Sequence, residues 1–320
     1  MRYLKSFNES LQFPTDPRVV LNLLKAITPE HGTNISIYDR IKIHPDGTVD
    51  VIRGSIKLNL CHDFHNIPIK FGIVDEVFDL RADGNELWNL EGSPHTCGSF
   101  RAECIHLLSL VGGPKLVKDD YDVEYCDITN LEGGPEEVGG YFDISNTNIT
   151  SLKGGPKFVG GNFMAKNVTL TDLVGSPITV GGDFTVDCSS LRSLEGAPRE
   201  VGEGFYFSHS SANKNLWDPR PLKDCKIGAF YSGDTPLNCL RLLFSNISDS
   251  IGVTTENFLL SLDYNYIRGE KKINLFRVKE AISEIIGDIR PPIIDSDGKL
   301  YGWTFVDDEG RSVNFDGIPI

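Results

Sequence analysis

Proline returns at a nearly constant interval through the middle of the chain. The intervals are 20, 21, 21, 21, 21 and 21 residues, between Pro94, Pro114, Pro135, Pro156, Pro177, Pro198 and Pro219. The same set of apolar positions recurs with these prolines. In residues 142–161 the set consists of Phe142, Ile144, Ile149, Leu152 and Val159. A unit of this length cannot bury its own apolar side, but stacked units can share one core. The period therefore predicts a solenoid with one coil per unit.

Each coil has a predictable local structure. The alternating F-x-I segment is typical of a short strand with both apolar side chains on one face, and neighbouring coils should pair these strands in parallel. A looser first copy is expected at Leu80, Ala82, Leu87, Leu90 and Cys97. Proline disfavours a helix on the far side, which should be extended. Glycine pairs such as Gly139–Gly140 and Gly160–Gly161 are expected to adopt positive φ angles.

The F-x-I-x-x-T-x-I-x-x-L pattern resembles the signature of leucine-rich repeats. The phrase L-x-G-x-P-x-x-V-G-G-x-F more closely resembles repeat proteins of tailed bacteriophages. Sequences that flank the repeats in such proteins are resembled by three segments of this chain, residues 47–51, 54–58 and 264–269. The resemblance covers roughly 47–287. It implies a leucine-rich-repeat-like solenoid with an extended convex side, a helical N-terminal cap and an α+β C-terminal cap. The ladder asparagine of such repeats is nearly always replaced, so small or apolar residues should fill that layer.

Three regions follow from this pattern. Residues 1–46 form an N-terminal region with a helix at 16–28, where Asp16 and Pro17 suit the start of a helix. Residues 47–219 form the solenoid. Residues 220–320, where the period stops, are either a cap or a small functional domain, and 299–306 with 311–315 should form a hairpin.

Composition and net charge limit the class of molecule that the chain can bind. A net charge of −14 disfavours nucleic acid and anionic lipid, which need basic surfaces, and permits a basic protein partner. No apolar run is long enough for a membrane span, and the first residues contain no secretory signal, so a cytoplasmic location is expected. The seven cysteines form no C-x-x-C pair, so we expect reduced thiols, no metal site and no cofactor.

Residues between the inward anchors should point outward and line up across coils. The candidate binding residues combine three such rows: Arg81, Arg101, Glu103, Asp122, Glu124, Tyr125, Asp143, Asn146, Lys166, Asp187, Tyr206 and His209. Arg81 is expected beside Arg101 in the first row. Residues 119–143 contain nine carboxylates and no Lys or Arg, which indicates either a solvated acidic surface or a docking patch for a basic protein. Tyr125 is the candidate interface anchor.

Catalytic signals are weak. The segment 61–65 contains metal-capable residues but falls in a coil, and Asp187, Ser208 and His209 lack the oxyanion loop of a hydrolase. The favoured function is a protein-binding module, encoded by a phage, that binds and inhibits a host or viral protein. One alternative is an internal virion component, because 3–10 resemble a capsid-targeting leader. The other is a repeat-guided enzyme with its activity in 220–320.

Overall fold

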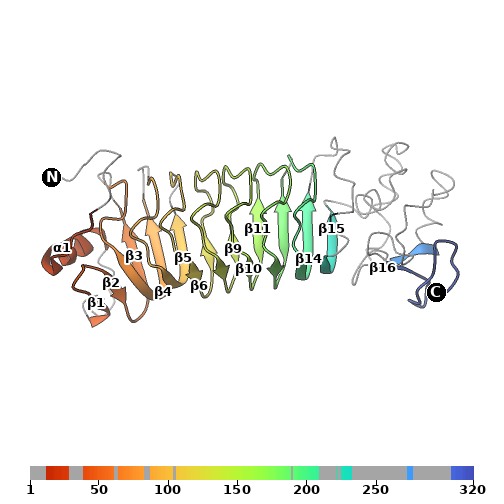
Figure 1. Cartoon of the computed structure of the whole chain (residues 1–320), viewed down its shortest axis with the longest axis horizontal. Coiled ribbons are helices and arrows are strands. Elements are labelled where there is room, and N and C mark those ends of the chain that lie inside the picture. Colours follow the sequence, from red (N-terminus) through yellow and green to blue (C-terminus); the bar gives the residue numbers. More distant parts are fainter. Residues whose placement is uncertain are drawn as a thin grey trace.

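The computed structural model describes residues 12–28, 39–60, 64–82, 87–103, 106–188, 190–208, 221, 225–232, 272–276 and 304–320. The described chain is a parallel β-solenoid of about 7 turns with a spacing of about 21 residues and little helix. Figure 1 shows the coils side by side along the long axis of the molecule. The expectation of a repeat solenoid with one coil per unit is therefore confirmed.

Each regular coil contributes strands to two parallel sheet faces. The first, which we call the F-x-I face, contains β3 (Ile56–Asn59), β7 (Tyr121–Asp122), β9 (Phe142–Asp143), β11 (Phe163–Lys166) and β13 (Phe184–Asp187). The second, the P-x-x-V face, contains β2 (Val49–Val51), β6 (Leu116–Val117), β8 (Glu137–Val138), β10 (Phe158–Val159) and β12 (Thr179–Val180). Longer strands contribute to both faces: β4 (Phe71–Arg81), β5 (Thr96–Glu103), β14 (Glu200–Ser208) and β15 (Lys226–Ser232).

The interior is a set of columns, and the aromatic column is the most regular. Phe142, Phe163 and Phe184 pair in register, with ring centroids 5.6 and 4.8 Å apart and the rings stacked. Tyr121 and Phe100 extend the column toward the N-terminus at 5.3 and 4.9 Å. Stacked aromatic pairs contribute about 0.5–1.5 kcal/mol each beyond the area they bury. All five anchors predicted in residues 142–161 are at most 1% exposed.

Of the positions where leucine-rich repeats place asparagine, the structure describes three, at 126, 147 and 168, and small or apolar residues fill these three as expected. Cys126, Thr147 and Val168 are buried there. The Thr147 hydroxyl donates to the Ile144 carbonyl at 2.7 Å, and the Cys126 thiol lies 3.3 Å from the Ala102 carbonyl. The layer thus satisfies its few polar atoms locally.

The expected role of the glycine pairs after the P-x-x-V strands was wrong. Positive φ angles of 85–100° occur instead at the glycine two positions before each proline from Pro94 to Pro198: Gly92, Gly112, Gly133, Gly154, Gly175 and Gly196. Gly139 and Gly160 are required for a different reason. A Cβ atom on Gly160 would run into the carbonyl oxygen of Gly139, and one on Gly139 into that of Lys118. These glycines allow successive coils to approach closely.

Ahead of each of these glycines, a hydrogen bond to a side-chain oxygen holds a turn of the backbone. This oxygen accepts the amide of the residue two positions later, at 2.9–3.3 Å, and belongs to Asn89, Ser109, Asn130, Ser151, Asp172 and Ser193. Such Asx and Ser turns mimic a backbone turn and hold the bend. The repeated Asn, Ser or Asp before leucine is thus a structural signal in the sequence.

The N-terminal end begins with the helix expected at 16–28. Helix α1 (Pro17–Ile27) begins after Asp16, whose carboxylate accepts the Arg18 amide at 2.8 Å. Its residues Val20, Leu24 and Ile27 join the core, and Figure 1 places α1 at the end of the stack. Strand β1 (Ile41–Ile43) pairs antiparallel with β2, so β2 is paired on both sides.

The C-terminal residues form a second small sheet. Strand β16 (Lys272–Asn274) pairs in parallel with β17 (Thr304–Val306), and Val306 bridges Ser312 in the antiparallel sense. The expected hairpin is thus present from 304 onward, and 299–303 lie outside the described residues. In the solenoid, β15 continues the parallel sheet beyond the boundary expected at 219.

We predict that Gly160→Ala lowers the free energy of unfolding by roughly 1–3 kcal/mol, because overpacking forces adjacent coils apart. Denaturant melts followed by circular dichroism would measure the loss. The exposed Lys153→Ala variant is the control and should unfold like the wild type. An unchanged melt for Gly160→Ala would show that the coils do not approach this closely.

Candidate functional site

The outward residues of the F-x-I face form two rows, set by strand register. The first row contains Asp79, Arg101, Asp122, Asp143, Met164, Thr185 and Tyr206. The second contains Arg81 and Glu103 on neighbouring strands, continues through Glu124, and includes Lys166 and Asp187 on two further strands. Their inward neighbours are the buried anchors, so alternation along each strand separates core from surface as expected. Most of the candidate residues therefore share one face.

The expected place of Arg81 was wrong. Phe78, not Leu80, pairs with Phe100, so Arg81 lies opposite Glu103 in the second row and Asp79 lies opposite Arg101. The step from Phe78 to Phe100 is 22 residues, whereas Leu87 bridges Leu107 after 20. This first coil carries an irregularity between its strand and its turn, which shifted the sequence alignment by two residues.

The N-terminal end of this face is a network of ion pairs. The Arg81 guanidinium contacts Glu103 at 2.6 Å and Asp79 at 3.6 Å, and the Lys57 ammonium lies 3.8 Å from Asp79. Exposed pairs of this kind contribute about 0–1 kcal/mol each. Opposite charges therefore neutralise each other at this end, and it offers little net field to a partner.

The centre of the face is an acidic patch formed by Asp122, Glu124 and Asp143. Burial raises the pKa of Asp122 above its ordinary value; the backbone amide of Glu124 lowers it, while the carboxylates of Asp143 and Glu124 raise it. Arg101 on the preceding strand has a smaller, opposing effect. The Glu124 amide donates to Asp122 at 3.0 Å, and the Asn146 amide group donates to Glu124 at 2.9 Å. The patch thus concentrates like charges in a fixed geometry.

A row of left-handed residues borders the acidic patch. Tyr125, Asn146 and Asn167 have φ angles of 62°, 57° and 55°. Asn146 and Asn167 are linked by a side-chain hydrogen bond of 2.9 Å between coils. Asparagine tolerates this conformation, whereas for a bulky residue it is strained by roughly 1–2 kcal/mol. Tyr125 adopts it nonetheless and leaves its side chain 61% exposed.

The C-terminal end of the F-x-I face carries a mixture of apolar, aromatic and charged side chains. Met164 and Tyr206 are partly exposed in the first row, and Lys166 and Asp187 are exposed in the second. The Tyr206 ring lies over Gly204, where a Cβ atom would meet it. His209 lies outside the described residues, so it is not placed beside the others.

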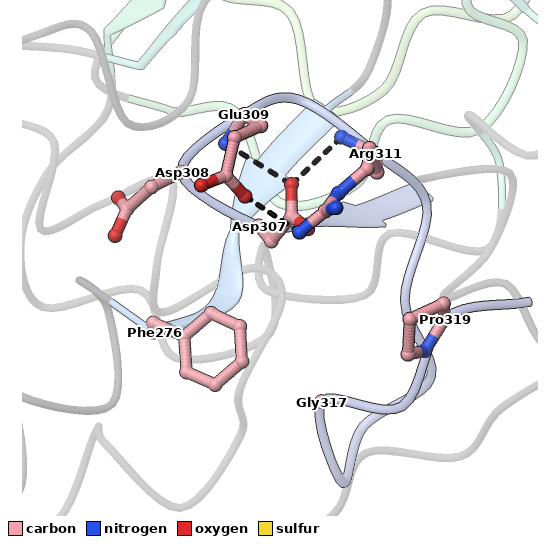
Figure 2. Close-up of a pocket in the computed structure, with 7 residues that line it drawn as sticks. All are labelled: Phe276, Asp307, Asp308, Glu309, Arg311, Gly317 and Pro319. Atoms are coloured by element: carbon pink, nitrogen blue, oxygen red, sulfur yellow. Dashed lines mark hydrogen bonds and ion pairs between the residues drawn. The ribbon is translucent and has the colours of Figure 1, made fainter.

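The small C-terminal sheet contains a separate hollow of about 320 Å³. Figure 2 shows its lining residues, with the Asp307 carboxylate held inside its own loop. It accepts the Glu309 amide at 3.1 Å, and the Arg311 amide and guanidinium at 2.8 and 2.6 Å. Burial would raise the pKa of Asp307, but the Arg311 bonds outweigh it and hold the pKa below the ordinary value. These contacts indicate that Asp307 stabilises the loop.

The described residues offer neither a metal cluster nor a membrane-spanning helix. Within the described ranges, no group of three or more His, Cys, Asp or Glu side chains could hold a metal ion. Of the metal-capable segment 61–65, His65 stacks on Trp88 at 4.8 Å, and 61–63 lie outside the described residues. No helix in the described part of the chain is both long and apolar enough to cross a membrane.

We predict that Asp122→Asn raises the melting temperature at pH 7. Because the pKa of Asp122 is raised on folding, ionising it penalises the folded state, and this penalty grows as pH rises through the carboxyl range. Asparagine keeps the acceptor for the Glu124 amide. Well below pH 3.8, where both the folded and the unfolded carboxyl are protonated, the difference from wild type should close.

Calorimetry at several pH values would test this expectation. Asp172→Asn makes the same exchange in an Asx turn away from the acidic patch, and should shift the melting temperature little. A lower melting temperature for Asp122→Asn at pH 7 would contradict the electrostatic account.

Comparison of the chain with protein-family models, with curated proteins and with solved structures finds no match. The functional assignment therefore depends on the geometry and charge of the F-x-I face.

Proposed function

We propose that the chain is a protein-binding module whose partner docks on the F-x-I face over the acidic patch. The observation that carries this proposal is Tyr125, an aromatic side chain that is 61% exposed on a left-handed backbone. Asparagine occupies the equivalent position in the next two coils without this strain. Strained residues persist where the surrounding structure holds them, and they cluster at functional sites. Exposed tyrosines are frequent energetic centres of protein interfaces.

Charge defines the class of partner. Tyr125 directly follows Glu124 of the acidic patch, and burial together with repulsion from Asp143 and Glu124 makes ionised Asp122 unfavourable in the free protein. Lysine or arginine side chains of a partner would relieve that repulsion and steer association. A basic protein segment that can pack an apolar group against Tyr125 fits this surface best. The same charges disfavour phosphate-bearing partners.

The biological context rests on the resemblance to phage repeat proteins. In this proposal the solenoid is leucine-rich-repeat-like, with α1 and the C-terminal sheet as its caps. It acts in the cytoplasm of an infected bacterium, where it binds and inhibits a host or viral protein. The rigid stack of coils supports this role, because a fixed scaffold lets outward residues vary without loss of the core.

The first test is capture of a partner from bacterial lysate, with and without phage infection, followed by affinity measurement. We expect a basic partner whose binding weakens as salt is raised, because the contacts are charged. Tyr125→Ala should weaken binding at least tenfold, and Asp122→Lys should abolish it. Thr185→Ala, in the first row two coils beyond Asp143, is the matched control. Equal binding by Tyr125→Ala and wild type would reject the proposed site.

A second prediction separates strain from recognition. Tyr125→Asn should raise the free energy of unfolding by roughly 1 kcal/mol, because asparagine accepts the left-handed backbone, and should still weaken partner binding. Denaturant unfolding and the affinity assay would measure the two effects on the same sample. A variant that is both less stable and fully active would contradict the assignment of Tyr125 as a strained anchor.

A further inference from the structure

Three unfavourable local features meet in one short segment of the stack, residues 121–126. The first concerns Tyr121, whose side chain is fully buried in the aromatic column. Among the residues that the structure describes, none is a hydrogen-bond partner for its hydroxyl. A buried hydroxyl without a partner destabilises the folded state, because opening the structure returns it to water. The other rings in register with Tyr121 all belong to phenylalanine: Phe78, Phe100, Phe142, Phe163, Phe184 and Phe205.

The second feature is the backbone at Tyr125. Its φ angle of 62° is unfavourable for a bulky residue, whereas Asn146 and Asn167 tolerate similar angles in the next two coils. The hydrogen bond that the Tyr125 amide donates to the following coil is also the longer one. It measures 3.2 Å, against 2.8 Å for the equivalent bond at each of the two asparagines. The segment is therefore held less firmly at this end.

The third feature is Asp122, which lies between these two residues. Burial, and to a smaller extent the carboxylates of Asp143 and Glu124, raise the pKa of Asp122. Its ionised form therefore adds a cost to the closed segment. If the segment leaves the sheet, the hydroxyl and the carboxylate return to water and the tyrosine leaves the left-handed region. One movement relieves all three costs.

The coil two steps further on provides an internal comparison. At the three equivalent positions it carries Phe163, Met164 and Asn167, so none of these costs arises there. Its strand β11 pairs with β13 over four residues, whereas β7 pairs with β9 over two. The stability of a repeat array is approximately a sum over units and their interfaces, so one unfavourable coil makes a local weak point.

We propose that residues 121–126 open locally from the solenoid while the rest of the stack stays folded. Opening takes Val123 and Cys126 out of the core, where both are buried. Within a folded protein, the segments with the least favourable contacts open most often. The three features place that segment in the middle of the stack, away from its two ends.

This opening bears on the proposed function. Asp122, Glu124 and Tyr125 all lie in the segment, so only its closed form presents the docking surface over the acidic patch. A basic partner that binds the closed form should therefore hold the segment shut, because a ligand stabilises the state that it binds. This consequence rests on the proposed function, whereas the opening itself does not.

The reaction of Cys126 with a thiol reagent measures the opening, because its side chain is only 1% exposed when the segment is closed. Val168 is buried in the same layer two coils further on, so Val168→Cys supplies a matched thiol in the same molecule. Iodoacetamide labelling of this folded variant is mapped by mass spectrometry and normalised to the rates in the denatured chain. Cys126 should react about tenfold faster or more than the introduced thiol. Any destabilisation by Val168→Cys acts against this difference.

Two further substitutions connect the opening to its causes. In the Val168→Cys background, Tyr121→Phe and Tyr125→Asn should each slow the labelling of Cys126 by about threefold or more, because each removes one cost of the closed segment. Neither should change the rate at the introduced thiol, and Lys153→Ala should change neither rate. Equal rates for the two thiols overturn the proposal, and so does a Cys126 rate that neither substitution lowers.

A synthetic oligolysine tests the link to the proposed function separately. At low salt it should slow the labelling of Cys126 and leave the introduced thiol unaffected. If oligolysine changes neither rate, the docking surface over the acidic patch is contradicted, while the difference between the two thiols still supports the opening.

Discussion

Close stacking of successive coils is the constraint on which the rest of the structure depends. Every coil must place its backbone at strand-pairing distance from the next, because parallel pairing supplies the hydrogen-bond partners that a buried backbone requires. Gly139 and Gly160 make this possible where a Cβ atom would strike a neighbouring carbonyl. The aromatic column then fills the interior at centroid spacings of 4.8–5.6 Å through Phe142, Phe163 and Phe184. Backbone spacing and ring stacking therefore reinforce one register.

That register also determines what the surface can do. Because side chains alternate along each strand, the same stacking that buries Phe163 and Ala165 projects Met164 and Lys166 outward. The two sheet faces consequently present different chemistry on one scaffold. The F-x-I face offers carboxylates and an exposed tyrosine, while the P-x-x-V face offers exposed apolar side chains beside charged groups of both signs. We propose a protein partner for the first face.

Much of the fold could be predicted from the sequence because period and burial agree. Phe142, Ile144 and Leu152 repeat at fixed intervals, and residues with one environment in every coil must share one column. The first coil could not be aligned in this way. The interval to the next coil is 22 residues at Phe78 but 20 at Leu87, and a search for a constant period of about 21 hides this shift, which moves Arg81 to the second row.

The candidate site was predicted less completely than the core. The carboxylates of the acidic patch are visible as a run in the sequence, but backbone conformation at Tyr125 is not. Asn146 and Asn167 occupy the position equivalent to Tyr125 in the next two coils. Because asparagine tolerates left-handed backbone, these two residues were the sequence signal that could have predicted the conformation. The glycine pairs were recognised, yet composition alone does not distinguish a positive φ angle from a close approach between coils. Only the neighbouring coil distinguishes them.

Distances between spin labels on the F-x-I face test the stacking most directly. Labels carried by unnatural amino acids at Asp79 and, in turn, at Met164, Thr185 and Tyr206 should lie four, five and six coils apart. Double electron–electron resonance should then give separations of about 19, 24 and 29 Å, rising by about 4.8 Å per coil. Separations that fail to increase in equal steps would contradict the stacked register.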